Sequence, residues 1–139
     1  MCSSDLLTRK HGIGTLLMFA VRSIFSRPEK LREAIAELVA KGELPQAMLE
    51  QENPLGFLVH EGGASSVSDA AYRFVRHEPG VDVVLFGTGN KEHLKQNIAS
   101  ILKPPLPERD RNQVVKLFGH LVGVGMDIPN RAPRPPRVA

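Results

Sequence analysis

The stretch VDVVLFGTGNKEHLKQN, residues 81–97, decides how the fold is interpreted. A run of mostly β-forming residues ends in Gly-Thr-Gly-Asn, and a polar sequence with helical spacing follows at once. A strand that passes directly into a helix is typical of a βα unit. Asn90 suits the N-cap of this helix, and its apolar side consists of Leu94, Ile98, Ile101 and Leu102.

A second βα unit precedes it. Residues 13–21, IGTLLMFAV, form an apolar run of the length expected for a strand buried on both faces of a parallel sheet. Ser26-Arg-Pro-Glu29 matches a capping box with Pro28 near the first helical position. The apolar spacing that follows predicts a helix over residues 28–41.

Residues 42–63 are irregular, with one short helical turn predicted within 46–51. A helix begins near Ser66, and another amphipathic helix is predicted over residues 107–121. Two apolar strands separated by helices predict a parallel pair in an α/β fold. The organisation expected is one body over residues 1–121 and a disordered Pro/Arg-rich tail over 122–139.

Composition narrows the classes of partner. The net charge is +3, but residues 130–139 hold three arginines and no acid, so the rest is neutral. A neutral body predicts no nucleic-acid partner. Cys2 is the only cysteine, the first ten residues carry no apolar run of signal-peptide type, and no segment approaches the length of a membrane span. We therefore expect a cytoplasmic protein without a membrane partner.

The glycine corner, residues 87–90, suits an anion. A helix start offers N–H groups and a partial positive charge, and glycines let a ligand approach the backbone. Thr88 and Asn90 add polar groups and Lys91 adds a charge. The Gly-x-Gly-x-x-Gly spacing fails at Glu92, and the Walker pattern is missing too, so a plain strand-to-helix turn is the alternative.

Three segments together resemble the C-terminal part of an aldo/keto reductase: GIGTLLMFAVR, SVSDAAYRFVRHEPGVDVVLFGTGN and EHLKQNIASIL. The resemblance covers roughly residues 11–103. It implies a partial (β/α)8 TIM barrel, with the last two βα units, strands seven and eight, and a C-terminal helix. The implied activity is NADPH-dependent reduction of aldehydes or ketones, and the phosphate site would follow strands seven and eight.

The resemblance also implies the cofactor-binding residues. The corner after strand eight and the helix behind it would hold the adenosine end and the ribose phosphate. Many relatives carry Lys-Ser where this chain has Gly87-Thr88, so NADPH and NADH both stay open. The loop after strand seven would meet the diphosphate. The implied set is Phe19, Arg22, Gly87, Thr88, Gly89, Asn90, His93, Gln96 and Asn97.

The family's catalytic Asp, Tyr, Lys and His lie on the first four strands, for which this sequence has no counterpart. No catalytic residue and no metal ligand is therefore predicted, and the chain is expected to be inactive alone. Its partners would be a nicotinamide dinucleotide and the missing N-terminal barrel portion; a carbonyl substrate would bind only to an intact barrel. A non-catalytic, barrel-completing subunit and an inert truncated product are the alternatives.

Other polar and aromatic residues have plainer interpretations. Tyr72, the only tyrosine, lies at helical spacing beside Phe74 and is expected to pack in the core. His60-Glu61 is expected to be an ordinary loop pair, with an acid/base pair or half a metal site as the alternative. His77 is expected to cap a helix end.

Overall fold

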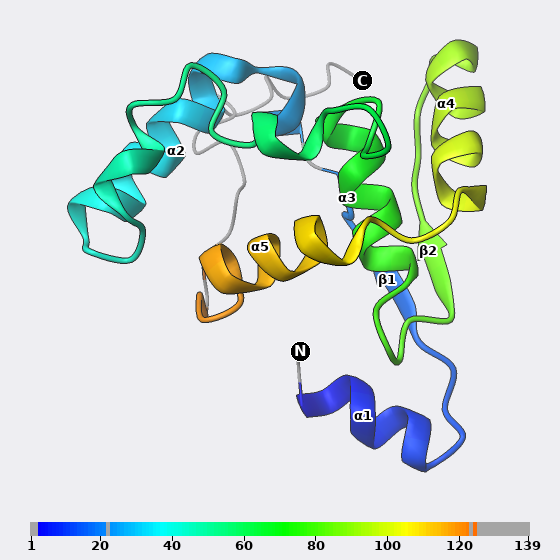
Figure 1. The fold of residues 1–139 in the computed structure, drawn as a ribbon. Helices are drawn as coiled ribbons and strands as arrows, with labels where there is room; N and C mark the ends of the chain where they lie inside the picture. The colour runs from blue at the N-terminus through cyan, green and yellow to red at the C-terminus, as the bar shows by residue number, and fades with distance from the viewer. Residues whose placement is uncertain (1–2, 22, 123, 125–139) are drawn as a thin grey trace, which may run out of the picture.

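The structure, a computed structural model, describes residues 3–21, 23–122 and 124. Helices dominate, and two short strands pair between them (Figure 1). The elements in chain order are α1 (Ser3–Lys10), β1 (Leu16–Met18), the 3-10 helix η1 (Ser23–Ser26), α2 (Pro28–Ala40), the 3-10 helices η2 (Gln46–Met48) and η3 (Gly56–Leu58), α3 (Val67–Arg76), β2 (Val83–Leu85), α4 (Lys91–Leu102) and α5 (Glu108–Phe118).

The two strands run parallel, as the sequence predicted, which places the chain in the general α/β class. Leu16 pairs with Val83, and Met18 pairs with Leu85. Both strands are shorter than the predicted 13–21 and 81–86. Among the described residues each strand has only the other as a neighbour, and the two strands pair over three positions, so only those residues form the sheet.

One face of this sheet is covered and the other is exposed. Tyr72 of α3 contacts Phe86 with ring centroids 5.8 Å apart, so α3 lies on the face that carries Phe86 and, two residues earlier, Val84. The opposite face carries two cross-strand pairs that are between 41% and 61% exposed: Leu16, Met18, Val83 and Leu85. The expectation that the first strand is buried on both faces is therefore wrong for this chain, since α3 supplies a cover on one side.

The hydrophobic core lies beyond α3, away from the sheet. Helix α2 contributes Leu31, Ile35 and Leu38, which recur at the spacing of one helix face. The connection between α2 and α3 and the segment before α5 supply most of the other buried side chains, which include Leu44, Met48, Leu55, Leu58 and Leu106. Figure 1 shows α2 and its short helices on one side of α3, and α4 on the other.

Local capping explains most of the helix starts. Ser66 accepts a hydrogen bond from the Asp69 amide at 3.1 Å and opens α3, and Asn90 opens α4. The predicted capping box of α2 is wrong: its N-cap is Arg27, whose side chain makes no capping hydrogen bond. The fixed φ of Pro28 in the first turn pre-organises this start instead. The predicted tail, 122–139, lies outside the described residues apart from Val122 and Val124.

Candidate functional site

The ends of the two strands bring the predicted site together. Because β1 and β2 are parallel and Met18 is level with Leu85, the segments after them leave the same edge of the sheet. In open α/β sheets this carboxyl edge is where ligands bind. The corner at Gly87 and the loop that begins at Phe19 are therefore neighbours, as the sequence predicted.

The two glycines of the corner face open space. A Cβ built at Gly87 or at Gly89 would have nothing within 4 Å, and neither residue has a positive φ. Neither backbone strain nor a close neighbour in the chain therefore requires glycine here. Their lack of side chains does keep the backbone accessible from outside, which is the property an anion needs.

Thr88 and Asn90 hold the corner in shape. The Asn90 amide donates to Thr88 Oγ1 at 3.1 Å, and Asn90 Oδ1 accepts from the amides of Glu92 and His93 at 2.8 and 3.3 Å. Two of the first-turn donors of α4 are thus already bound by the cap. A phosphate at this corner would bind mainly to the backbone ahead of the helix.

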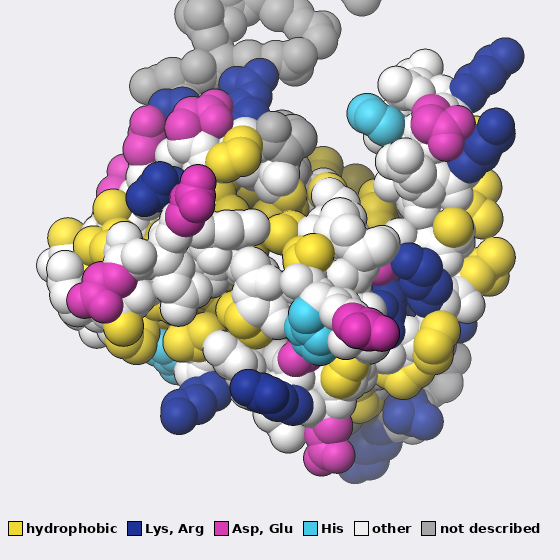
Figure 2. Space-filling model, turned by 45° about the horizontal axis from the view of Figure 1, so that its top comes forward, with side chains coloured by type: hydrophobic (Ala, Val, Ile, Leu, Met, Phe, Trp, Pro, Cys, Tyr) yellow, Lys and Arg dark blue, Asp and Glu magenta, His cyan; other side chains and the backbone are white. Residues whose placement is uncertain are grey.

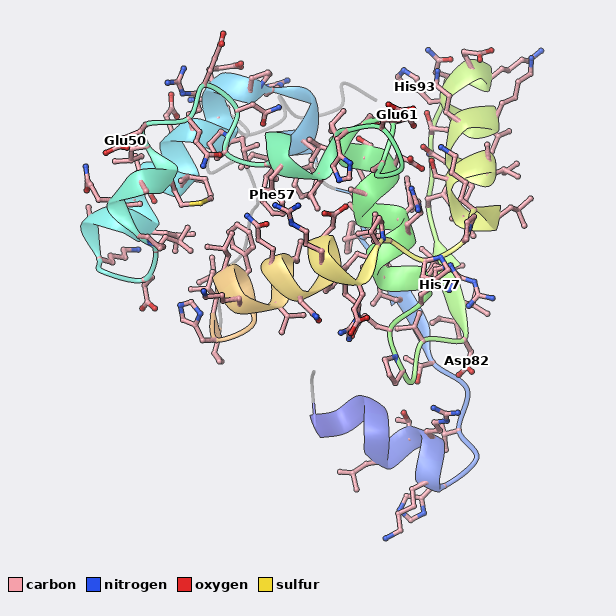
Figure 3. All side chains as sticks on the ribbon, viewed as in Figure 1. Glu50, Phe57, Glu61, His77, Asp82 and His93 are labelled. Carbon is pink, nitrogen blue, oxygen red and sulfur yellow. The ribbon has the colours of Figure 1, made fainter. Side chains whose placement is uncertain are left out.

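Helix α4 carries the rest of the predicted site into solvent. His93 and Gln96 are exposed and Asn97 is half-buried, and Figure 3 places His93 near the start of α4. His93 and Asn97 lie one turn apart and share a face of the helix. Lys91 is exposed in the first turn, and Lys95 Nζ lies 3.7 Å from Glu92 Oε2. The site is an open shelf, not a closed cavity.

The loop after β1 contributes one strained residue. Phe19 has a φ of 64°, in the left-handed region that non-glycine residues rarely adopt. The residue is 59% exposed. Strained backbone of this kind clusters at binding sites. The other residue predicted from this loop, Arg22, lies outside the described residues.

A buried polar cluster near the start of α3 was missed by the sequence. Arg73 donates to the carbonyls of Gly63 at 2.8 Å and of Pro104 and Pro105, each at 2.9 Å. Asp69, 2% exposed, accepts from Lys103 Nζ at 2.9 Å and from the amide and hydroxyl of Ser65. Burial alone would raise the pKa of Asp69, but these hydrogen bonds outweigh it and lower the pKa below its ordinary value.

His60 also has a partner that the sequence did not suggest. Its Nε2 lies 2.9 Å from Oδ2 of Asp110, fifty residues away in the first turn of α5. The expected partner, Glu61, contributes its backbone carbonyl at 2.8 Å from Nδ1. No local pattern links positions 60 and 110. The acidic residues in the first turn of α5, Glu108 and Asp110, were the one feature of the sequence that could have suggested a partner for His60.

The plainer interpretations hold for two further residues. Tyr72 is buried, as predicted, and burial raises its pKa. His77 is the C-cap residue of α3, and its Nε2 lies 3.0 Å from the Lys103 carbonyl. Within the described part of the chain no three His, Cys, Asp or Glu side chains group as metal ligands do. None of the helices described there has both the length and the apolar character needed to cross a bilayer.

An apolar cavity of about 320 Å³ lies between α3 and α5, and Ala20 of the loop after β1 is among its lining residues. Its wall includes Phe25, Phe74 and Phe118. Comparison with known proteins adds nothing to the geometry: no family model, no curated protein and no solved structure matches this chain. The resemblance to aldo/keto reductases therefore stays a prediction from the sequence.

Proposed function

We propose that this chain is the cofactor-binding C-terminal part of an aldo/keto reductase, and that its glycine corner holds the phosphate-bearing end of NADPH. The supporting observation is the open backbone at Gly87 and Gly89, next to a helix start at the carboxyl edge of two parallel strands. In this proposal β1 and β2 are strands seven and eight of a (β/α)8 barrel, where the fold places its phosphate sites.

The residues present fit a nucleotide phosphate. The space beside both glycines is empty of other side chains, and Lys91 adds a cation in the first turn. The exposed side chains of His93 and Gln96 would face the adenosine end. Because Asn90 already occupies the Glu92 and His93 amides, the proposed donors are the N–H groups of the corner itself.

The chain's task in the reduction is binding and orientation. NADPH, when bound, supplies the hydride for a carbonyl substrate. The corner and α4 would fix the adenosine end so that the nicotinamide reaches the mouth of the completed barrel. The proton donor would come from strands outside this chain.

Titration of the isolated chain with NADPH, followed by nucleotide fluorescence, tests the proposal. Gly87→Val and Gly89→Val would each place a branched side chain in the open space and should weaken binding at least about tenfold, or about 1.4 kcal/mol. Gly14→Val is the matched control, because Gly14 lies before β1, has no positive φ and would meet Asp82 Oδ2 at an ordinary 3.8 Å. A dissociation constant of about 1 mM corresponds to a binding free energy of only roughly 4 kcal/mol. The absence of any fluorescence change at that nucleotide concentration would contradict the proposal.

A second candidate function is a non-catalytic subunit that completes another chain's barrel. The exposed sheet face, with Leu16, Met18, Val83 and Leu85, favours it, since parallel sheets are almost always covered on both faces. Figure 2 shows further hydrophobic side chains at the surface, among interspersed Lys, Arg, Asp and Glu. Leu94, Ile98 and Leu102 of α4 are also exposed.

Co-expression with a polypeptide that carries the first six strand–helix units of an aldo/keto reductase tests this candidate. An equimolar complex with reductase activity is expected, and a Met18→Lys/Leu85→Lys variant should not form it. The exposed double variant Lys95→Met/Lys116→Met is the control. Equal complex formation by all three chains would remove the sheet face from the interface.

A further inference from the structure

His60 lies between two hydrogen-bond acceptors. Its Nε2 is 2.9 Å from Asp110 Oδ2, and its Nδ1 is 2.8 Å from the Glu61 carbonyl oxygen. An ionised carboxylate and a carbonyl accept hydrogen bonds but donate none, whereas neutral imidazole carries a single N–H. The imidazolium, with an N–H on each nitrogen, is therefore the form that satisfies both contacts.

Gly63 shapes this arrangement. A Cβ at Gly63 would lie 2.7 Å from His60 Nε2, so the ring packs directly against the glycine backbone. The Asp110 side chain is only 5% exposed, while that of His60 is 44% exposed. The acceptor is thus held inside the protein, and the ring still exchanges its proton with solvent.

Besides the burial of Ala64 in the core, two polar side-chain contacts tie the loop of residues 59–64 to its surroundings. Arg73 binds the Gly63 carbonyl and, through Pro104 and Pro105, the segment that leads to α5. Its guanidinium keeps its charge at all physiological pH values. The His60–Asp110 contact joins the same loop to α5 itself, and it is the one of the two that titrates.

The charges around His60 favour its protonation on balance. The Glu61 carbonyl and then Asp110 raise the pKa of His60 above its ordinary value of 6.5, while desolvation and, less strongly, Arg109 on α5 oppose them. Arg73 and Lys103 line the hollow beside the ring, but each already faces an acceptor of its own: Arg73 the Gly63 carbonyl, and Lys103 the Asp69 carboxylate. The Glu61 side chain is the remaining acid in the loop.

We propose that His60 and Asp110 form a pH-sensitive latch, which holds the 59–64 loop on α5 most tightly while His60 is protonated and loosens as the proton leaves, because the one remaining N–H can serve only one of the two acceptors. The latch is independent of the nucleotide site and acts on a different part of the chain. Because the folded state raises the proton affinity of His60, its contribution is complete below pH 6.5 and is lost as pH rises above that value.

The loop contains its own reporters. The Gly63 amide donates to the His60 carbonyl and the Ala64 amide to the Leu58 carbonyl, each at 2.9 Å. Hydrogen exchange of these two amides, corrected for intrinsic base catalysis, should accelerate several-fold as pH rises through the His60 titration. NMR titration of the imidazole resonances of the full chain, with His60 assigned by its absence in His60→Gln, gives the titration directly.

Variants separate the latch from a general pH effect. Asp110→Asn should return the His60 titration toward 6.5, and His60→Gln should abolish the pH dependence of exchange at Gly63 and Ala64. His77→Gln is the matched control, because His77 also contacts one carbonyl but lies outside this loop. The latch is refuted if exchange follows the same pH profile in His60→Gln as in the wild type. A wild-type His60 that titrates at or below 6.5 refutes it equally, without reliance on any variant.

Discussion

Replacing Arg73 should destabilise the protein more than replacing any exposed arginine. The Arg73 side chain is 7% exposed, and its guanidinium donates to three backbone carbonyls, those of Gly63, Pro104 and Pro105. Hydrogen bonds from a charged donor contribute about 1.5–3 kcal/mol each, but the sum is not additive, and removal of one partner of a buried charged cluster costs about 3–5 kcal/mol. We therefore expect Arg73→Met to lower the free energy of unfolding by about 3–5 kcal/mol.

Denaturant unfolding followed by far-UV circular dichroism measures this loss. Arg73→Lys keeps the charge but not the planar fork, so it should lose about 1.5–3 kcal/mol. Arg32→Met, in the exposed part of α2, is the control and should stay within about 0.5 kcal/mol of the wild type. A loss below about 1 kcal/mol for Arg73→Met would refute the idea that this side chain ties the three segments together.

Three further predictions follow from other contacts. Ser66→Ala removes the N-cap of α3 and should cost about 1 kcal/mol in the free energy of unfolding, measured by the same denaturant titration. Gly63→Ala should displace the His60 ring, since the new Cβ would lie 2.7 Å from Nε2, and an NMR titration should then show the pKa of His60 moving back toward 6.5; an unmoved titration would contradict the close packing. The pKa of Asp69 is lowered in the folded state, so its contribution to stability is present above pH 3.8 and is lost as pH falls below that value. The free energy of unfolding of Asp69→Asn should therefore fall less steeply with decreasing pH in that range than that of the wild type.

The helices were predictable because their determinants are local. Pro28, Ser66 and Asn90 mark the starts of α2, α3 and α4, and the apolar spacing behind each start agrees with the buried face that forms. The cap of α2 was misassigned by one residue, because the Ser-x-x-Glu pattern competes there with a 3-10 helix that includes Ser26. Local sequence does not decide between those two outcomes.

The strands were predicted in kind but not in environment. An apolar run indicates burial, yet Leu16 and Met18 are exposed, because what covers a strand is a matter of tertiary structure. The candidate site shows the same contrast between features set by local sequence and contacts set by tertiary structure. The corner at residues 87–90 and its cap were visible in the sequence. The contact of His60 with Asp110 and the three carbonyl contacts of Arg73 join residues 10 to 50 positions apart and leave no periodic trace.

The pairing of β1 with β2 also sets the order of events during synthesis. Residues 15 and 82 are separated by 67 positions, and so are the paired Leu16 and Val83. At a translation rate of about 5–20 residues per second, the first strand waits roughly 3–13 s on the ribosome before its partner exists. Sheet closure must then bring together the ends of a long loop, so the pair forms after the helices between them. During that interval Leu17, which is half-buried in the folded chain, lacks its partner Val84 and is open to a chaperone near the exit tunnel.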